Sequence, residues 1–77
     1  MNGSAEAVEF IVLDDFKYLN IPLKDLILNK NTLIAGIIRE SKNIIPGGDD
    51  VILPNDRVII IASNASVNDL SDIIRKK

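Results

Sequence analysis

Apolar and polar residues alternate along much of this chain, and the pattern predicts four strands separated by polar turns. Residues 7–13 alternate with a period of two, the spacing of a strand that has one strongly apolar face. Residues 32–38 and 57–62 are apolar on both alternating faces and rich in β-branched side chains, so each is expected to be a strand that needs cover on two sides. Residues 43–46 are expected to form a short strand that Pro46 ends.

Two short helices are expected to cover one face of this sheet. Pro22 suits the first position of a helix, because its missing amide would have no partner there, and apolar residues follow at helical spacing over residues 22–28. Ser66 and Asp69 resemble a capping box at the start of a second helix, which should run to the C-terminus. Its apolar stripe would consist of Val67, Leu70, Ile73 and Ile74. The order strand, helix, three strands, helix predicts an α+β fold, β-α-β-β-β-α, with a mainly antiparallel or mixed sheet.

The connection between the last two strands is acidic and rich in Gly and Pro. Gly47 and Gly48 permit a tight reversal, and a carboxylate beside such turn formers can accept hydrogen bonds from nearby backbone amides. Three carboxylates in one connection could also suggest a divalent-metal site, but their spacing does not match an EF-hand loop, so turn capping is the preferred interpretation. No metal site is predicted. The residues assigned a structural role in turns are Pro46, Gly47, Gly48, Asp49 and Asp56, and Asp50 is interpreted in the same way.

Composition limits what the chain can do. Its 77 residues make one domain, near the size at which a single core becomes marginal, and 47% apolar with 26% charged residues is typical of a folded protein. It contains neither Cys nor His, which removes thiol catalysis, disulfides, the usual zinc sites and the commonest general base. Nine basic and eleven acidic residues give a net charge of −2, and the cations are scattered, which argues against nucleic-acid binding. No catalytic residues are predicted, and an enzyme is not expected.

Several fragments, in order, resemble the RCK C-terminal (TrkA-C) domain of TrkA-like potassium uptake regulatory subunits. They are residues 5–10, residues 22–26, residues 33–39, Ile45-Pro46 followed by Gly48-Asp49, and Asp56-Arg57-Val58. The resemblance covers about residues 5–76. Residues 5–77 are therefore expected to be this domain, and residues 1–4 a flexible or added N-terminus.

The resemblance implies a regulatory, ligand-sensing and dimerising domain of a cytoplasmic subunit that controls potassium transport. It further implies a homodimer, an attached Rossmann (RCK N-terminal) lobe in the parent protein, and an integral membrane transporter partner at the inner face of the plasma membrane. NAD or ATP would bind only in the Rossmann lobe, because this chain has no Gly-x-Gly-x-x-Gly run. The alternative is a ligand-binding accessory domain of an unrelated transporter or transcription regulator.

A homodimer also has a physical reason. Two strands that are apolar on both faces need more cover than two short helices can supply, so a second copy of the chain is expected to cover the open face. The alternative is that residues 14–19 and 51–53 fold back over the open face. The candidate interface residues are Leu33, Ile34, Ile37 and Ile38.

Ligand-binding candidates lie at two places. Arg39 closes an apolar strand and could offer a fork of donors to an anion, although an exposed hairpin Arg next to Glu40 is the common alternative. Asn29, Lys30 and Asn31 lie where the resemblance implies the dimer groove of family members that bind cyclic di-AMP. A cyclic dinucleotide is therefore the ligand that the resemblance suggests, although Lys30 stands where those members carry an Arg.

Overall fold

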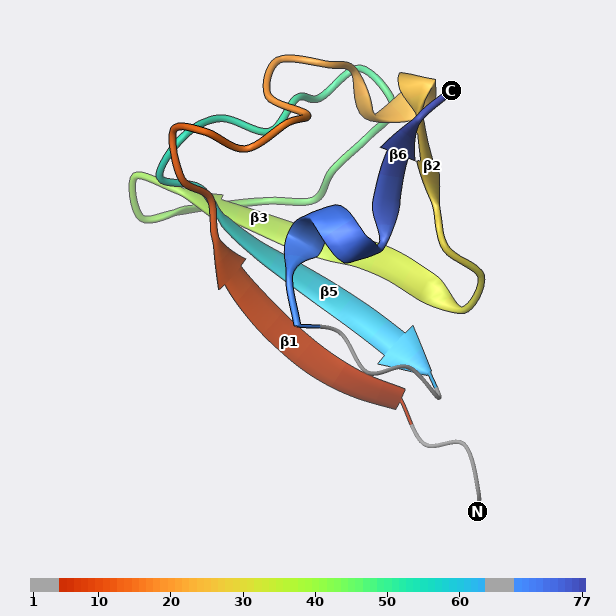
Figure 1. Cartoon of the computed structure of the whole chain (residues 1–77). Coiled ribbons are helices and arrows are strands. Elements are labelled where there is room, and N and C mark those ends of the chain that lie inside the picture. The colour runs from red at the N-terminus through yellow and green to blue at the C-terminus, as the bar shows by residue number, and fades with distance from the viewer. Residues whose placement is uncertain (1–4, 64–67) are drawn as a thin grey trace.

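The computed structural model describes residues 5–63 and 68–77, whose strands form two antiparallel sheets (Figure 1). The larger sheet has the order β1-β5-β3-β4, and the smaller one pairs β2 with β6. The strands are β1 (Ala5–Ile11), β2 (Leu26–Leu28), β3 (Thr32–Arg39), β4 (Lys42–Ile44), β5 (Arg57–Ser63) and β6 (Ile74–Lys76). Two single 3-10 turns, η1 (Leu23–Asp25) and η2 (Leu70–Asp72), precede β2 and β6. Residues 1–4, expected to be a flexible or added N-terminus, lie outside the described residues.

The four expected strands are present as β1, β3, β4 and β5, with ends shifted by up to two residues. All pairings in both sheets are antiparallel. The most hydrophobic segment, β5, lies in the sheet interior between β1 and β3, as its β-branched run indicates. The apolar segment at residues 51–53 forms no strand, but it brings Ile52 into the core, where that side chain is completely buried.

The prediction of two helices is wrong for the described residues. Residues 22–28 form one 3-10 turn followed by β2, and the C-terminal segment forms another 3-10 turn followed by β6. Helices this short are marginal without tertiary support, whereas β2 and β6 satisfy each other's backbone groups in a ladder that pairs Leu28 with Ile74. The proposed capping residue Ser66 lies outside the described residues.

The larger sheet has one buried and one open face. Register places Ile60 between Val8 and Ile34, and Val58 between Phe10 and Ile37, so these side chains share the inner face. The smaller sheet, η2 and the long connections gather on that side (Figure 1). The buried core consists of Val12, Leu26, Ile34, Ile37, Ile52, Val58, Ile60, Ala62, Leu70, Ile73 and Ile74.

An irregularity in β3 decides which of its side chains enter this core. The register with β5 shifts between Ile34 and Gly36, which leaves Ala35 as an extra residue. Residues three apart would face opposite sides of a regular strand, yet the bulge puts both Ile34 and Ile37 on the inner face. Leu33 and Ile38 consequently share the opposite, outer face.

The hairpin between β3 and β4 turns through Glu40 and Ser41, whose φ angles are 50° and 66°. Two consecutive left-handed residues define a type I′ turn, which matches the twist of the flanking strands and favours Asn-Gly. Both residues carry a side chain that makes this backbone conformation costly.

We expect Glu40→Asn combined with Ser41→Gly to raise the free energy of unfolding by about 1 kcal/mol, because Asn and Gly tolerate the left-handed region better than the native residues do. Urea denaturation followed by circular dichroism measures the change. Ser71→Gly serves as the control, since Ser71 has no left-handed backbone and should gain nothing. Equal effects of the two changes would show that the turn is not strained.

Candidate functional site

A buried ion pair holds the end of β3 to the turn before β5. The Arg39 guanidinium donates from Nε to Oδ1 of Asp56 at 2.8 Å and from one terminal nitrogen to Oδ2 at 2.8 Å. The same nitrogen also donates to the Val51 carbonyl at 2.9 Å. The Asp56 side chain is 1% exposed and that of Arg39 is 28% exposed, so the carboxylate is buried while the cation reaches the surface.

The carboxylate also organises the turn that contains it. The Leu53 N–H donates to Oδ2 of Asp56 at 2.9 Å, and the Asp56 N–H donates to the Leu53 carbonyl at 3.2 Å. Asn55 has a φ of 71° at the third position, as a type II turn after Pro54 requires. Burial would raise the pKa of the Asp56 carboxyl, but hydrogen bonds from Arg39 and Leu53, together with the Arg39 charge, hold that pKa below its usual value.

The Gly-rich part of this connection docks on η1. Leu23 N–H donates to the Asp50 carbonyl at 2.9 Å and Lys24 N–H to the Gly48 carbonyl at 2.9 Å. Oδ2 of Asp50 accepts from the Gly47 N–H at 2.6 Å, which caps this turn. Asp49 is exposed and pairs with Nζ of Lys24 at 2.9 Å. The connection therefore binds the segment before β2 mainly through its backbone.

These elements leave the outer face of the larger sheet open, and this face carries several apolar side chains. Register aligns Ala7, Ile61 and Leu33 in one row across β1, β5 and β3, and Glu9, Ile59 and Gly36 in the next. Leu33 is 59% exposed and Ile61 is 37% exposed. We call the set Ala7, Ile11, Leu33, Gly36, Ile38, Ile59 and Ile61 the outer face.

One ion pair lies on this outer face. The Arg57 Nε donates to a carboxylate oxygen of Glu9, diagonally across β1 and β5. The hydrogen bond from Arg57 is the main cause that lowers the pKa of the Glu9 carboxyl. Glu9 thus finds its cation within the chain.

The four candidate interface residues divide between the two faces of β3. Ile34 and Ile37 lie in the core, at 9% and 1% exposure, whereas Leu33 and Ile38 lie on the outer face. The contributions of Ile59 and Ile61 were missed, although the two apolar faces of residues 57–62 were a signal that this strand also needs cover on its outer side.

The candidate ligand residues fall at opposite ends of β3. Asn31 directly precedes this strand and Arg39 ends it, so about 26 Å separates them at a rise of about 3.3 Å per residue. Asn29 Nδ2 donates to the Asp72 carbonyl at 3.1 Å, and the Asn31 carbonyl accepts from the Ser63 N–H at 2.9 Å. Lys30 is exposed. A small ligand therefore cannot contact both groups within one molecule.

A hydrophobic pocket of about 230 Å³ lies next to the outer face. Leu33 belongs to both, and the stem of Lys24 lies on the pocket wall, where a Cβ added at Gly48 would approach Lys24 Cβ to 3.3 Å. The other lining residues are Leu23, Leu26, Leu28, Ile34, Pro46 and Gly47. Sequence reasoning missed this pocket because it placed Leu23 to Leu28 on a helix.

Two other kinds of site are not found in the described part of the chain. Within residues 5–63 and 68–77, no three His, Cys, Asp or Glu side chains gather into a group that could hold a metal ion. Over the same ranges, no helix is long and apolar enough to span a bilayer.

The family model of the TrkA-C domain matches residues 7–75. This chain belongs to the TrkA-C domain family. A relative from Pyrococcus abyssi, "Trk system potassium uptake protein TrkA homolog", is 39% identical over 74 residues, which are 95% of this chain and 33% of the relative. A Methanosarcina mazei relative, "Trk system potassium uptake protein trkA homolog 1", is 29% identical over 75 residues, 97% of this chain and 18% of the relative.

A solved structure described as "Structure of RCK domain with cda" resembles this TrkA-C domain in three dimensions. It has a TM-score of 0.66 and 29% identity, over 75% of this chain and 81% of that one. The domain spans a third or less of the length of these curated relatives. The family recognised from the sequence fragments is thus confirmed, and the relatives carry additional chain beyond this domain.

We expect Asp56→Asn to lower the free energy of unfolding of this TrkA-C domain by about 3 kcal/mol, since Arg39 then lacks its carboxylate. The native contribution has a defined pH dependence. Because the pKa of Asp56 is lower in the folded state, its stabilisation is complete above the unfolded value, about 4, and is lost as the pH falls through the folded value.

Urea denaturation across pH 3 to 7 measures both effects. In the Asp56→Asn variant, the free energy of unfolding should no longer show the decrease at low pH that protonation of this carboxylate causes. Asp14→Asn, at an exposed carboxylate, is the control and should change stability little. A loss for Asp56→Asn no larger than that of the control would contradict the role assigned to the pair.

Proposed function

We propose that this TrkA-C domain is a regulatory and dimerising module of a potassium-uptake subunit, and that two copies pair through the outer face of the larger sheet. The curated relatives are named as Trk system potassium uptake proteins, which favours potassium transport over an unrelated transporter or transcription regulator. Regulation without chemistry agrees with a chain that has no Cys and no His. The exposed apolar outer face is the observation that carries the pairing.

The chemistry of the outer face supports a second copy as its partner. Gly36 contributes no side chain beside Ile59, so a flat surface can approach closely there. Leu33 and Ile61 stand beside it and remain exposed in the single chain. Covering about 400 Å² of apolar surface corresponds to about 10 kcal/mol before the costs of association. A self-complementary patch on a small domain is typical of a two-fold symmetric dimer.

The wider setting follows from the partial coverage of the relatives. We infer that the parent protein adds a Rossmann lobe, the place for NAD or ATP, and that the assembly lies in the cytoplasm against an integral membrane potassium transporter. A ligand or partner that prefers one arrangement of the paired domains would shift the attached lobes by its difference in affinity.

We expect Ile61→Glu to prevent pairing, because each dimer would bury two unpaired carboxylates in the outer face. Size-exclusion chromatography with light scattering over a range of micromolar concentrations measures the mass. Ile27→Glu is a matched control, since Ile27 and Ile61 are 36% and 37% exposed but Ile27 lies on the smaller sheet. A native chain that stays monomeric, or equal disruption by the two variants, would reject the outer face as the interface.

A second candidate function is binding of a cyclic dinucleotide in the hydrophobic pocket beside Leu33. The support is the similarity to an RCK domain whose structure is described with cda, and the position of the pocket next to the proposed dimer interface. Leu28 and Pro46 offer apolar surface to a base, while Lys24 supplies a cation that can leave its exposed partner Asp49 for a phosphate. A ligand there would contact the outer face and could bias pairing. The four candidates Asn29, Lys30, Asn31 and Arg39 do not line this pocket, and they stay a separate prediction in which one ligand could contact only one end of β3 within a molecule.

We expect cyclic di-AMP to raise the melting temperature of the native chain, because a ligand that binds only the folded state stabilises it. Lys24→Gln should raise the concentration of cyclic di-AMP needed for half-saturation about tenfold, because it removes the cation that pairs with the phosphate. Lys42→Gln, which removes a cation on β4, is the matched control and should leave it unchanged. Absence of any shift with cyclic di-AMP would reject this candidate while leaving the dimer proposal intact.

A further inference from the structure

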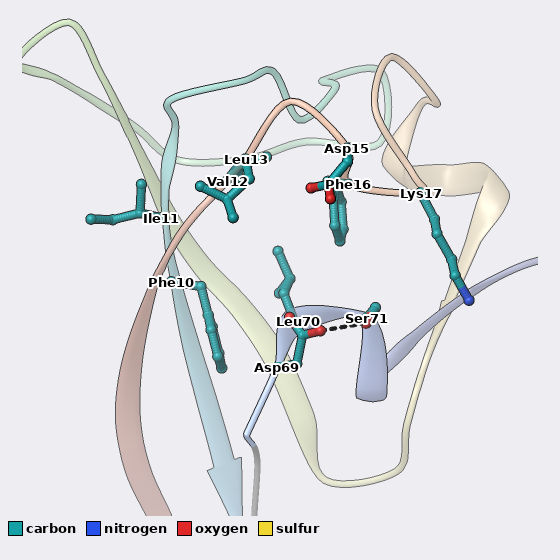
Figure 2. A pocket seen from close by; sticks show the side chains of 10 residues that line it. All are labelled: Phe10, Ile11, Val12, Leu13, Asp15, Phe16, Lys17, Asp69, Leu70 and Ser71. Carbon is teal, nitrogen blue, oxygen red and sulfur yellow. Dashed lines mark hydrogen bonds between the residues drawn. The ribbon is translucent and has the colours of Figure 1, made fainter.

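A hollow of about 350 Å³ lies between the end of β1 and the turn η2. Phe10, Phe16 and Leu70 border the same open space, as Figure 2 shows. Phe10 comes from the inner side of β1, Phe16 from the connection that follows it, and Leu70 from η2. The volume is at the lower end of the range of about 300–1,000 Å³ that small-molecule sites occupy.

The apolar part of the hollow is fixed by the fold. The ring of Phe16 meets that of Tyr18 edge to face, with centroids 5.7 Å apart and an interplanar angle of 79°. Leu70 is buried in the core, and Phe10 packs against the same core. A ligand would therefore find two aromatic rings already in place.

Charged groups stand around this apolar surface. Asp15 and Asp69 reach the hollow from its two sides, and Lys17 is the lining cation (Figure 2). Asp69 accepts a hydrogen bond from the Ser71 hydroxyl at 2.8 Å, which orients its carboxylate and leaves further acceptor positions. Asp15 has no hydrogen bond or ion pair with any described residue. Two carboxylates against one ammonium give the lining a charge of −1.

We propose that this hollow binds a small organic cation, an ammonium that carries an aromatic or branched apolar body. The rings of Phe10 and Phe16 attract a cation through their π faces, and carboxylates nearby neutralise it. The apolar body gains from leaving water against Leu70 and the two rings. An anion would meet two carboxylates and a neutral molecule would leave them unused, so the positive head decides the class of ligand.

The proposal does not depend on the proposed function. Ile11 is the only outer-face residue that lines this hollow, and the pocket beside Leu33 shares no residue with it. Failure of pairing or of dinucleotide binding would leave the cation site as it stands. The reverse also holds.

Nuclear magnetic resonance titration of the nitrogen-15 labelled full chain provides the test. The probes are 2-phenylethylammonium and 2-phenylethanol, which share a body and differ in the charged head. We expect the ammonium to shift the amide signals around Phe16 and Leu70, and to bind about fivefold more tightly than the alcohol. This comparison needs only the native protein, so it remains decisive if a variant fails to fold.

A pair of matched double variants then locates the charge effect. Asp15→Asn combined with Asp69→Asn removes the two lining carboxylates. The ratio of the two probes' dissociation constants should then fall to about one. Asp14→Asn combined with Asp72→Asn removes the same charge from nearby exposed residues that do not line the hollow, and should keep the roughly fivefold preference for the ammonium. Equal binding of the two probes, equal losses in both double variants, or no shift up to about 20 mM ammonium would overturn the proposal.

Discussion

The bond between Arg39 and Asp56 is the constraint on which the arrangement of this domain depends. It joins the end of β3 to the turn that starts β5, and through the Val51 carbonyl it also holds the connection between β4 and β5. That connection carries Ile52 into the core and binds η1 through the carbonyls of Gly48 and Asp50. A buried carboxylate with a forked cation and a backbone donor satisfies its oxygens fully, which is the condition under which burial of charge is tolerated. One pair of side chains therefore anchors the 12-residue span between β4 and β5, and backbone hydrogen bonds to η1 hold the rest of it.

The two faces of the larger sheet differ because the rest of the chain covers only the inner one. Long connections and the small β2-β6 ribbon fill the inner side, and no described element is left to cover the outer one. The Glu9–Arg57 pair gives the outer face a polar rim along β1, while its centre at Gly36 and Ile59 is apolar. An apolar centre with a charged rim is the usual anatomy of a protein interface. The proposed pairing thus uses the outer face of the sheet, which takes no part in the core.

The strands could be predicted from the sequence because their signal is local. Alternation in β1 and β-branched runs in β3 and β5 favour extended backbone wherever the segments pack. The strands β2 and β6 could not be predicted in the same way, since Leu23, Leu26 and Ile27 fit helical spacing and a short strand equally well. Only the pairing of β2 with β6, almost 50 residues apart along the chain, decides between them. Tertiary pairing overrides local preference in such short segments.

The candidate site was predictable only in outline. The need for cover on β3 was visible in its composition, but the bulge at Ala35 determines that Leu33 and Ile38 face outward while Ile34 and Ile37 face inward. A bulge leaves no clear mark in a run of apolar residues. The partner of Arg39 was similarly hidden, although antiparallel pairing of β3 and β5 would have placed it opposite Asp56.

The pairing of β1 with β5 and of β2 with β6 makes most structural contacts distant in sequence, with the β3–β4 hairpin as a local exception. During translation, β1 leaves the ribosome long before its partner β5 is made, and β2 long before its partner β6. Topologies of this kind fold slowly, since loop closure must precede the contacts that stabilise it. The nascent domain therefore presents unpaired apolar strands to its surroundings until β5 and β6 have been made, and chaperones have time to act on it during that interval.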